Sequence, residues 1–510
     1  MLIWKMAWRN IWRHKSKSLI IGAILMFGAL VMTLGYAVIE GSQQQIKKNA
    51  MERFTGHLVA LSEKETMRDL FFAPHPLRDI PNYLPVKAIL EQQKDLIADM
   101  LPIAKGRVMV LNDEGKSGSM SVFGVDMAEY LRFTNQNVAA VEGKLLEPGE
   151  RGVLISDETR KRIFETQRFW VTPEGADVDP TRLTPEARKR FDAGQLVVKH
   201  ELVMVGMSKY SLQNDIRLPV KGIFRYRQLN KLFAVHNFMD IESYREAFGL
   251  ITAANKATAL PEEDQAILDA SQEDIFGEGD IISETDTSAT YDLATVQAET
   301  RRAELKATTG VNLDNGVYTL VLLKLQPGIS PEEGQTRMNK IFSDAKSGVK
   351  TVTWIESLGE FGLIDAIARG SVAFFVMAVF FVAVIIIMNT LSMAALERAS
   401  EIGMMRAVGA QKSFIGGMFL METAQLSGIF GGAGIVAGML LTWIFIALRI
   451  SVANNEVLSV LLGGDAFHPI VNAHGILIGI AQLAIATLFA VAYPILVARK
   501  ITPLQAIAKD

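Results

Sequence analysis

The stretch LIIGAILMFGALVMTLGYAVI, residues 19–39, decides the fold. Its 21 residues carry no charge, and a helix rising about 1.5 Å per residue would reach about 31 Å, enough to cross a hydrocarbon core about 30 Å thick. A basic segment precedes the run, as it would in a secretory signal peptide. The apolar core is longer than signal peptides use, however, and the sequence YAVIEGSQQQ at its end offers no small-residue cleavage site. The sequence therefore predicts a membrane-spanning helix over 19–39.

Three further stretches without a charged residue lie near the C-terminus, at 370–396, 423–448 and 475–498. Each is long enough to span a bilayer as a helix, and we expect the third span to begin earlier, at 414, and to run to 448. The predicted fold class is therefore an α-helical membrane domain of four transmembrane helices. They are arranged as one plus three, with a long segment between the first and the second.

Composition supports a membrane protein and excludes several other classes. Hydrophobic residues make up 49% of the 510 residues and charged ones 21%, an apolar excess over what separate globular domains need. The 52 basic and 55 acidic side chains give a net charge of -3, which rules out a generally basic nucleic-acid binder. The chain has no cysteine, so disulfides, thiolate zinc sites and cysteine nucleophiles are excluded.

Lysine and arginine beside the spans predict the orientation, because cytoplasmic flanks are enriched in them. Residues 1–18 carry five and no acid, and both 397–413 and 499–510 carry three, whereas the loop 449–474 has only one. Both termini are therefore expected in the cytoplasm. Residues 40–369 then form a large extracytoplasmic domain, which a long segment can do whatever its charge.

The extracytoplasmic domain is predicted to be α+β. Runs of β-branched and alternating residues predict strands at 107–112, 119–125, 196–206 and 317–325, and helical patterns occupy 86–101 and 331–346. Residues 40–54 and 354–369 are polar but suit a helix, so we expect them to extend the first two spans outward as stalks.

The stretch 260–292 contains eleven acidic residues and no basic one. It reads as a solvated loop, and the alternative is a cation site or a surface for a basic partner. No regular calcium-loop spacing supports a cation site.

No motif in the sequence predicts catalysis, a metal site or a bound nucleotide. A phosphate-binding loop needs a glycine five residues before Gly115 of the only Gly-Lys-Ser, and Val110 stands there. The seven histidines form no H-E-x-x-H pair, and there is no G-x-S-x-G elbow. We therefore predict no catalytic residue, no metal ligand and no cofactor on this chain.

Near the N-terminus, Trp4, Trp8 and Trp12 recur every four residues, and each is followed by a lysine or arginine. On a helix this places an aromatic stripe beside a basic one, a pattern typical of a segment lying in the lipid headgroup region. The alternative is an ordinary basic leader that sets topology.

Glycines in the third span are spaced for helix packing. Gly428 and Gly432, and again Gly434 and Gly438, are four residues apart, which predicts a smooth stripe on one side of a membrane helix for close packing.

The loop LERASEIGMMRAVGAQKS, residues 396–413, is short, mixed in charge and compatible with a helix. Met404, Met405 and Val408 could make an apolar contact. From the residues alone, a docking helix and a simple connector are equally good interpretations.

Several segments in a fixed order resemble one permease family. They are AWRNIWRHKSKSL before the first span, ERASEIGMMRAVGA after the second, Glu422 ahead of a glycine-rich third span, and the closing ITPLQAIA. Together with the one-plus-three arrangement they are similar to the ABC permeases that include MacB, LolC, LolE and FtsX. The residues 122–126 and 141–156 also resemble the extracytoplasmic domain of the MacB and LolC/LolE branch. A long insertion around 160–195 and the acidic stretch depart from that pattern.

The resemblance implies a partner and a site. Permeases of this family pair with a second copy or a paralogue in the bacterial cytoplasmic (inner) membrane, and they bind a cytoplasmic ATPase that holds ATP and magnesium. The loop after the second span serves as the coupling helix. The residues expected to contact the ATPase are therefore Glu401, Gly403, Met404, Arg406 and Gly409.

Four functions then compete. The leading one is mechanotransmission that extracts or exports a lipoprotein or another lipophilic cargo. The others are MacB-like efflux of drugs or peptides through a periplasmic adaptor, FtsX-like regulation of a cell-wall hydrolase, and, least favoured, a membrane-anchored enzyme.

Overall fold

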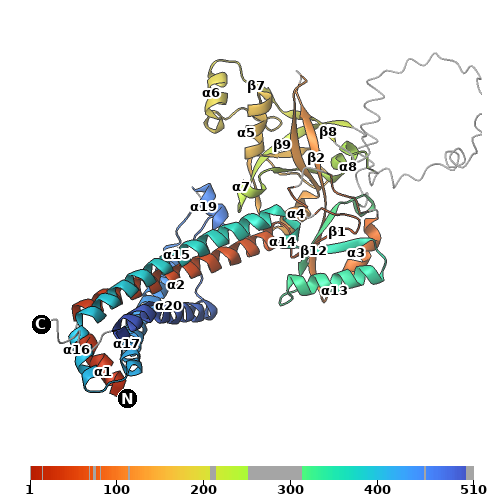
Figure 1. Ribbon diagram of the computed structural model, residues 1–510. Coiled ribbons are helices and arrows are strands. Elements are labelled where there is room, and N and C mark those ends of the chain that lie inside the picture. The colour runs from red at the N-terminus through yellow and green to blue at the C-terminus, as the bar shows by residue number, and fades with distance from the viewer. Residues whose placement is uncertain are drawn as a thin grey trace, which may run out of the picture. The chain divides into compact units, whose positions relative to one another are not determined.

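The structure is a computed structural model, and it describes the residues 2–13, 15–67, 69–72, 76–80, 82–112, 115–206, 214–250, 313–452 and 455–500. The acidic stretch 260–292 and most of the C-terminal tail, 501–510, lie outside the described residues. The chain divides into two compact units. Residues 1–49 and 361–510 form one, here called the helical unit, and residues 50–360 form the other, the sheet unit (Figure 1).

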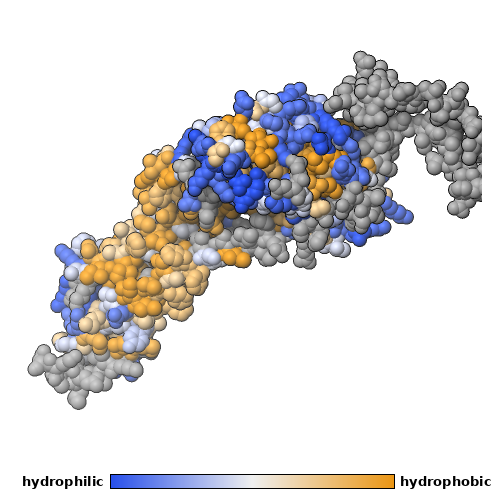
Figure 2. All heavy atoms as spheres, turned by 90° about the horizontal axis from the view of Figure 1, so that it is seen from above, coloured by the Kyte–Doolittle hydropathy of each residue, from blue (hydrophilic) through white to orange (hydrophobic). Residues whose placement is uncertain are grey.

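The helical unit contains long apolar helices joined by short ones. Its elements are α1 (Leu2–Arg13), α2 (Lys15–Arg53), α15 (Glu360–Glu397), α16 (Ala399–Ala407), α17 (Lys412–Leu426), the π-helical segment η3 (Ser427–Gly431), α18 (Gly432–Leu448), α19 (Glu456–Leu461) and α20 (Ala473–Lys500). Among the described residues, four candidate spans are long and apolar enough to cross a membrane: Ser18–Arg53, Ala373–Glu397, Lys412–Leu448 and Ala473–Ala498. Figure 2 shows apolar side chains covering these helices. The predicted one-plus-three arrangement is confirmed.

The two predicted stalks differ from one another. Helix α2 continues without a break from the apolar run through the polar residues 40–53. The second segment, by contrast, is divided: the short helix α14 (Trp354–Ser357) ends before Gly359, and α15 begins at Glu360. Gly359 has a φ of +53°, a left-handed conformation that favours glycine and interrupts a right-handed helix.

The sheet unit is built on one ten-stranded sheet. Its strands are β1 (Leu58–Ser62), β2 (Ile97–Leu111), β3 (Ser117–Val125), β4 (Val138–Gly143), β5 (Val153–Ser156), β8 (Glu201–Gly206), β9 (Asp215–Tyr226), β10 (His236–Asp240), β11 (Leu320–Leu325) and β12 (Val349–Thr353). The order is β12-β1-β11-β2-β3-β10-β5-β9-β4, and β8 pairs with both β2 and β9. The strands β2, β3, β10, β5, β9 and β8 therefore close into a ring, which leaves fewer unpaired edges.

Helices cover the sheet and complete a single large core. They are α3 (Tyr83–Glu91), α4 (Met127–Phe133), α5 (Asp157–Gln167), α7 (Asn230–Phe233), α8 (Ile241–Ala247), η2 (Leu313–Asn315) and α13 (Pro331–Asp344). Helix α13 buries Met338 and Phe342 in the core. On the same helix, the Asn339 amide donates to the Thr351 carbonyl at 3.2 Å, and its oxygen accepts from the Thr351 N–H at 2.6 Å. This side chain occupies hydrogen-bonding groups on the edge strand β12.

The predicted α+β class is confirmed, and one predicted helix is partly wrong. The pattern at 86–101 ends as a helix at Glu91, and from Ile97 the chain is strand β2. Met100 and Leu101 pair with Leu323 and Leu322 of β11. Burial of these side chains in the sheet overrides the local helical spacing, because strand formation depends strongly on tertiary packing. The other helical pattern is confirmed by α13, which starts at Pro331 after the N-cap Ser330.

The insertion around 160–195 forms a small satellite of the sheet unit. Its elements after α5 are β6 (Phe169–Val171), η1 (Pro180–Arg182), α6 (Pro185–Asp192) and β7 (Val197–Lys199), with β6 paired to β7. Phe164, Trp170 and Ala187 form its core. The buried Arg160 guanidinium lies 4.6 Å from the Trp170 ring centre and pairs with Glu142 and Asp157 at 2.8 and 2.9 Å.

The four glycines of the third span do not share one environment. A Cβ on Gly434 would lie 2.2 Å from the Met26 carbonyl oxygen of α2, and one on Gly438 would lie 2.9 Å from the Thr33 Cβ. A Cβ on Gly428 or Gly432 would meet nothing within 4 Å in this chain. The π-helical segment contains Gly428 and directly precedes Gly432, and it changes the helical register between the two pairs. Close packing against α2 therefore involves Gly434 and Gly438.

This difference predicts opposite outcomes for two glycine-to-alanine changes. Gly434→Ala should destabilise the helical unit by about 1–3 kcal/mol, because the added methyl overlaps backbone of α2. Gly428→Ala should be neutral or slightly stabilising, because alanine has the higher helix propensity by about 1 kcal/mol and its methyl meets nothing. Thermal unfolding in one detergent measures both. Equal destabilisation by the two changes would contradict the packing described for α2 and α18.

Lys105 on β2 predicts a pH dependence of the sheet unit. Burial lowers the pKa of this ammonium to about 8, and the attraction of Asp69 and Glu65 offsets only part of that effect. The unfolded chain, with a pKa near 10.5, then binds more protons than the folded one between pH 8 and 10.5, so stability should rise across this interval. The full gain in the free energy of unfolding is about 3 kcal/mol, because each pKa unit of difference corresponds to about 1.36 kcal/mol. Hydrogen-exchange protection of β2 amides measures it.

The matched variant is Lys105→Met, which keeps the length of the side chain and removes its titration. Its protection should show no such rise between pH 8 and 10.5. The assignment would be wrong if the variant kept the full pH dependence.

Candidate functional site

Helix α16 (Ala399–Ala407) is a short helix held between two long ones, and its C-terminus is set by Gly409. The Gly409 N–H donates to the Arg406 carbonyl at 3.1 Å, and the Ala410 N–H donates to the Met405 carbonyl at 3.0 Å. Gly409 has a φ of +103°, which favours glycine and is typical of a helix C-terminal cap. The chain then turns into α17 (Lys412–Leu426). The predicted helix in this loop is thus present.

One face of α16 is buried and another is open. Ile402 packs with Ala395, Ile415 and Phe419 in a small cluster of buried side chains. Met404 and Val408, by contrast, are 64% and 87% exposed. Exposed apolar side chains beside a folded core are typical of a surface that meets another molecule.

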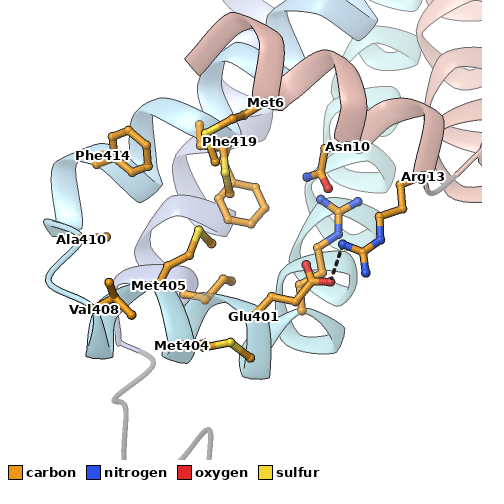
Figure 3. Close-up of a pocket in the computed structure, with 13 residues that line it drawn as sticks. Met6, Asn10, Arg13, Glu401, Met404, Met405, Val408, Ala410, Phe414 and Phe419 are labelled. Carbon is orange, nitrogen blue, oxygen red and sulfur yellow. Dashed lines mark ion pairs between the residues drawn. The ribbon is translucent and has the colours of Figure 1, made fainter. Parts of the chain in front are cut away.

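The five predicted coupling residues do not all lie on the open face. Met404 and Gly409 are exposed and Arg406 is partly exposed, whereas Gly403 is buried within the helical unit. The Glu401 carboxylate is engaged by the Arg13 guanidinium of α1 at 3.3 Å. Figure 3 shows these two side chains pointing toward one another.

An open groove of about 770 Å³ lies between α1, α16 and α17 (Figure 3). It is lined by Met6, Asn10, Arg13, Arg398, Glu401, Ile402, Met404, Met405, Val408, Ala410, Phe414, Met418 and Phe419. Most of these side chains are apolar and four are methionines, whose flexible thioethers adapt to different partner surfaces. The polar exceptions are Asn10 and the charged residues Arg13, Arg398 and Glu401. The groove can therefore receive an apolar side chain from a partner and hydrogen-bond a polar group beside it.

A buried ion pair lies among the groove's elements. The Arg398 guanidinium donates to both Glu422 carboxylate oxygens at 3.1 Å, and both side chains are buried. The Asn10 amide of α1 donates to the same carboxylate at 2.8 Å. One turn further along α17, the Gln425 amide donates to the Trp4 carbonyl at 3.1 Å. These contacts attach α1 to α16 and α17.

Helix α1 packs through one face and leaves its three tryptophans exposed on other faces. Ala7 and Ile11 are buried, while Trp4, Trp8 and Trp12 are exposed on other faces of the helix. The rings of Trp8 and Trp12 meet edge to face with centres 6.2 Å apart. This arrangement suits a helix that presents aromatic side chains to a lipid interface.

Asn10, Arg13 and Arg398 had no predicted role in the groove, and Glu422 was only one of the marks of the family resemblance. Residues 398 and 422 are 24 apart on different helices, so no helical spacing connects them. One signal in the sequence could have predicted the pair: Arg398 and Glu422 each lie beside a long apolar run, and a charged residue in such a place needs a buried partner.

The described residues contain no group of three or more histidine, aspartate or glutamate side chains able to hold a metal ion. A second cavity, of about 390 Å³, lies in the sheet unit and is lined by Val141, Asp157, Arg160, Lys161, Arg182 and Arg225. Asp157 pairs there with Arg160, Lys161 and Arg225. The lining holds four basic side chains and one acid, and Glu142, Glu158 and Asp179 also pair with Arg160, Lys161 and Arg182 respectively, so the cavity resembles a structural ion-pair network.

Comparisons with known proteins relate parts of this chain to permeases. Residues 373–503 match the family model described as FtsX-like permease C-terminal. Over 80 residues the chain is 40% identical to the ABC transporter permease YtrF of Bacillus subtilis (strain 168), a match that covers 16% of this chain and only 17% of that permease. The periplasmic region of MacB from Actinobacillus actinomycetemcomitans is similar over 60% of this chain and 92% of that one, at 8% identity and a TM-score of 0.26.

The buried pair predicts a difference between single and double substitution. Glu422→Leu alone should cost about 3–5 kcal/mol, because it leaves the Arg398 charge buried without its partner. Combining it with Arg398→Met should restore most of that loss, since a buried pair is often replaced by apolar residues at little cost. The free energy of unfolding in micelles measures both.

Glu401→Leu is the matched control, because it breaks an ion pair whose side chains are exposed. Its cost should be below about 1 kcal/mol. If the double variant were as unstable as Glu422→Leu, the pair would not be the interaction that matters here.

Proposed function

We propose that this chain, whose residues 373–503 match the FtsX-like permease C-terminal model, is the membrane-spanning subunit of an ABC transporter. The resemblance inferred from its sequence motifs is confirmed by that match. Helix α16 and the groove beside it would bind a cytoplasmic ATPase, and the chain would relay the ATPase's motion to the sheet unit. ATP and magnesium would be bound by the ATPase.

The observation that carries this proposal is the exposure of Met404 and Val408 beside an open apolar groove. Burying two such side chains in a partner would contribute about 25 cal/mol per Å² of apolar surface removed from water. Both residues lie on or just after a helix anchored through Arg398 and Glu422, so a force applied to them would reach α17 directly. A flexible connector would not transmit that force.

Relay of motion suits the spans better than passage through a polar channel. Three hydroxyl side chains there bond within the helical unit: Thr423 donates to the Phe419 carbonyl, Thr442 to the Gly438 carbonyl and Thr487 to the Ser427 hydroxyl. Polar groups satisfied in this way do not line a water-filled path. A permease of this kind can shift an equilibrium only by the difference in its affinity for two states.

The proposed setting is the bacterial inner membrane, with both termini in the cytoplasm and the sheet unit outside. The basic flanks at 1–18 and 397–413 support this orientation. We further propose that a second permease copy or paralogue meets the exposed apolar side chains of α15. The cargo would be a lipoprotein or another lipophilic molecule, because motion of the sheet unit could withdraw a substrate held in the adjoining leaflet without passing it through a channel.

Met404→Ala and Val408→Ala test the docking face. Each should weaken ATPase association by about tenfold, equivalent to about 1.4 kcal/mol, as expected for exposed anchors that fill a partner's pocket. Copurification with a candidate ABC ATPase, and titration of that ATPase, would measure the change.

Met393→Ala is the matched control, since Met393 is 62% exposed on α15 but lies outside the groove. It should leave the affinity unchanged. The docking assignment fails if the Met404 and Met393 variants bind the ATPase equally well.

A further inference from the structure

Helix α2 is held along nearly its whole length by the third and fourth spans and by the loop that joins them. In its apolar half, Gly22 lies against Phe430, Met26 against Gly434, and Thr33 against Gly438. Beyond the apolar half, α2 contacts residues 461–470 of the loop, here called the outer clamp. Its contacts extend from Ala37 to Asn49.

The contacts of the outer clamp are close and specific. The Ile470 N–H donates to the Ala37 carbonyl at 2.9 Å. The Ser42 hydroxyl donates to the Leu461 carbonyl, and the buried Asn49 amide donates to the Gly463 carbonyl at 2.6 Å. Two glycines permit the approach: a Cβ on Gly41 would lie 2.1 Å from the His468 carbonyl oxygen, and one on Gly463 would lie 2.6 Å from the Ile46 backbone nitrogen.

The two sets of contacts together surround α2. Gly22 and Thr33 are about three turns apart and share a face, because an α-helix has 3.6 residues per turn. Ala37 and Gly41 lie about 60° and about 100° around the helix from Gly22, and Asn49, about seven and a half turns away, lies on the opposite side. Contacts spread around the helix in this way restrict both its rotation and its sliding against its neighbours.

The outer half of α15, in contrast, has few such contacts among the described residues, whereas its inner half packs Ile387 and Leu391 against Ile21 and Leu25 of α2. In its most apolar window 12% of residues are buried, against 39% for α2. Phe374 and Phe381 are among its many exposed side chains. One close approach to α2 occurs at Gly35, where a Cβ would meet Val376.

We infer that the outer clamp is a positioning element, which fixes α2 to α18 and α20 as one rigid body against which α15 moves. This inference rests on the proposed function, because it says which helices stay fixed and which helix moves when the ATPase changes state. Asn49 and Gly463 are its positioning residues. Neither residue lines the groove proposed to bind the ATPase.

The absence of cysteine makes a direct test possible by pulsed electron paramagnetic resonance. Spin labels at Lys47→Cys and Leu448→Cys report the distance between α2 and α18, and labels at Phe374→Cys and Leu448→Cys report α15 against α18. The full chain is reconstituted with its ATPase and compared without nucleotide and after trapping with ATP and vanadate. The expected result is an unchanged α2 distance together with a shifted α15 distance.

A nucleotide-dependent shift of the α2 distance would overturn the inference. If neither distance changed with the ATPase bound, the proposed function would fail. The clamp is then tested separately, by measuring the 47–448 distance in the Gly463→Ala variant without nucleotide.

In Gly463→Ala the distribution of the 47–448 distance should broaden, because the added methyl meets the Ile46 backbone. Gly175→Ala carries the same backbone strain, at a φ of +73° against +74°, but its methyl meets nothing within 4 Å. Gly175→Ala should leave the distribution of the 47–448 distance as narrow as in the unchanged chain. Equal broadening in the two variants would contradict the clamp.

Discussion

The helical unit depends on the pairing of Arg398 with Glu422. A charge removed from water costs several kcal/mol unless a partner and hydrogen bonds compensate it, so these two side chains must stay together wherever α16 and α17 move. The third participant, Asn10, extends this requirement to α1. As a result, the helix that carries the tryptophan stripe and the one that exposes Met404 share a buried anchoring point. Motion imposed on α16 is transmitted to α17 and α1 because separating them would leave a buried charge without a partner.

The same logic of close fit applies to the first span. Glycines at 434 and 438 let α18 approach the backbone of α2, and Gly463 does the same for the outer clamp. Without a hydrophobic driving force between helices inside lipid, this close van der Waals packing and a few hydrogen bonds hold the spans together. Among the described residues, the outer half of α15 lacks an equivalent set of contacts. Its exposed apolar side chains leave it available to lipid or to a second copy of the chain.

How much the sequence could predict depended on the range of the interactions involved. The four spans follow from runs of uncharged residues, and α13 follows from Ser330, Pro331 and a helical pattern, so all of these were predictable. The strand from Ile97 was not, because its pairing with β11 joins residues more than 200 positions apart. For the same reason the Arg398–Glu422 pair and the clamp at Asn49 were missed: each joins different helices. The coupling helix was predicted through its family resemblance, but the burial of Gly403 and the ion pair of Glu401 required the structure.

In the proposed function, nucleotide bound by the partner ATPase changes the conformational state of the sheet unit. Hydrogen–deuterium exchange of the sheet unit, in the full chain reconstituted with its ATPase, tests that claim most directly. The account predicts that ATP with vanadate alters exchange in the strands of the sheet unit, and that the same nucleotide has no effect on the chain without the ATPase. Identical exchange in every nucleotide state of the complex, or an ATP effect on the chain alone, would contradict it.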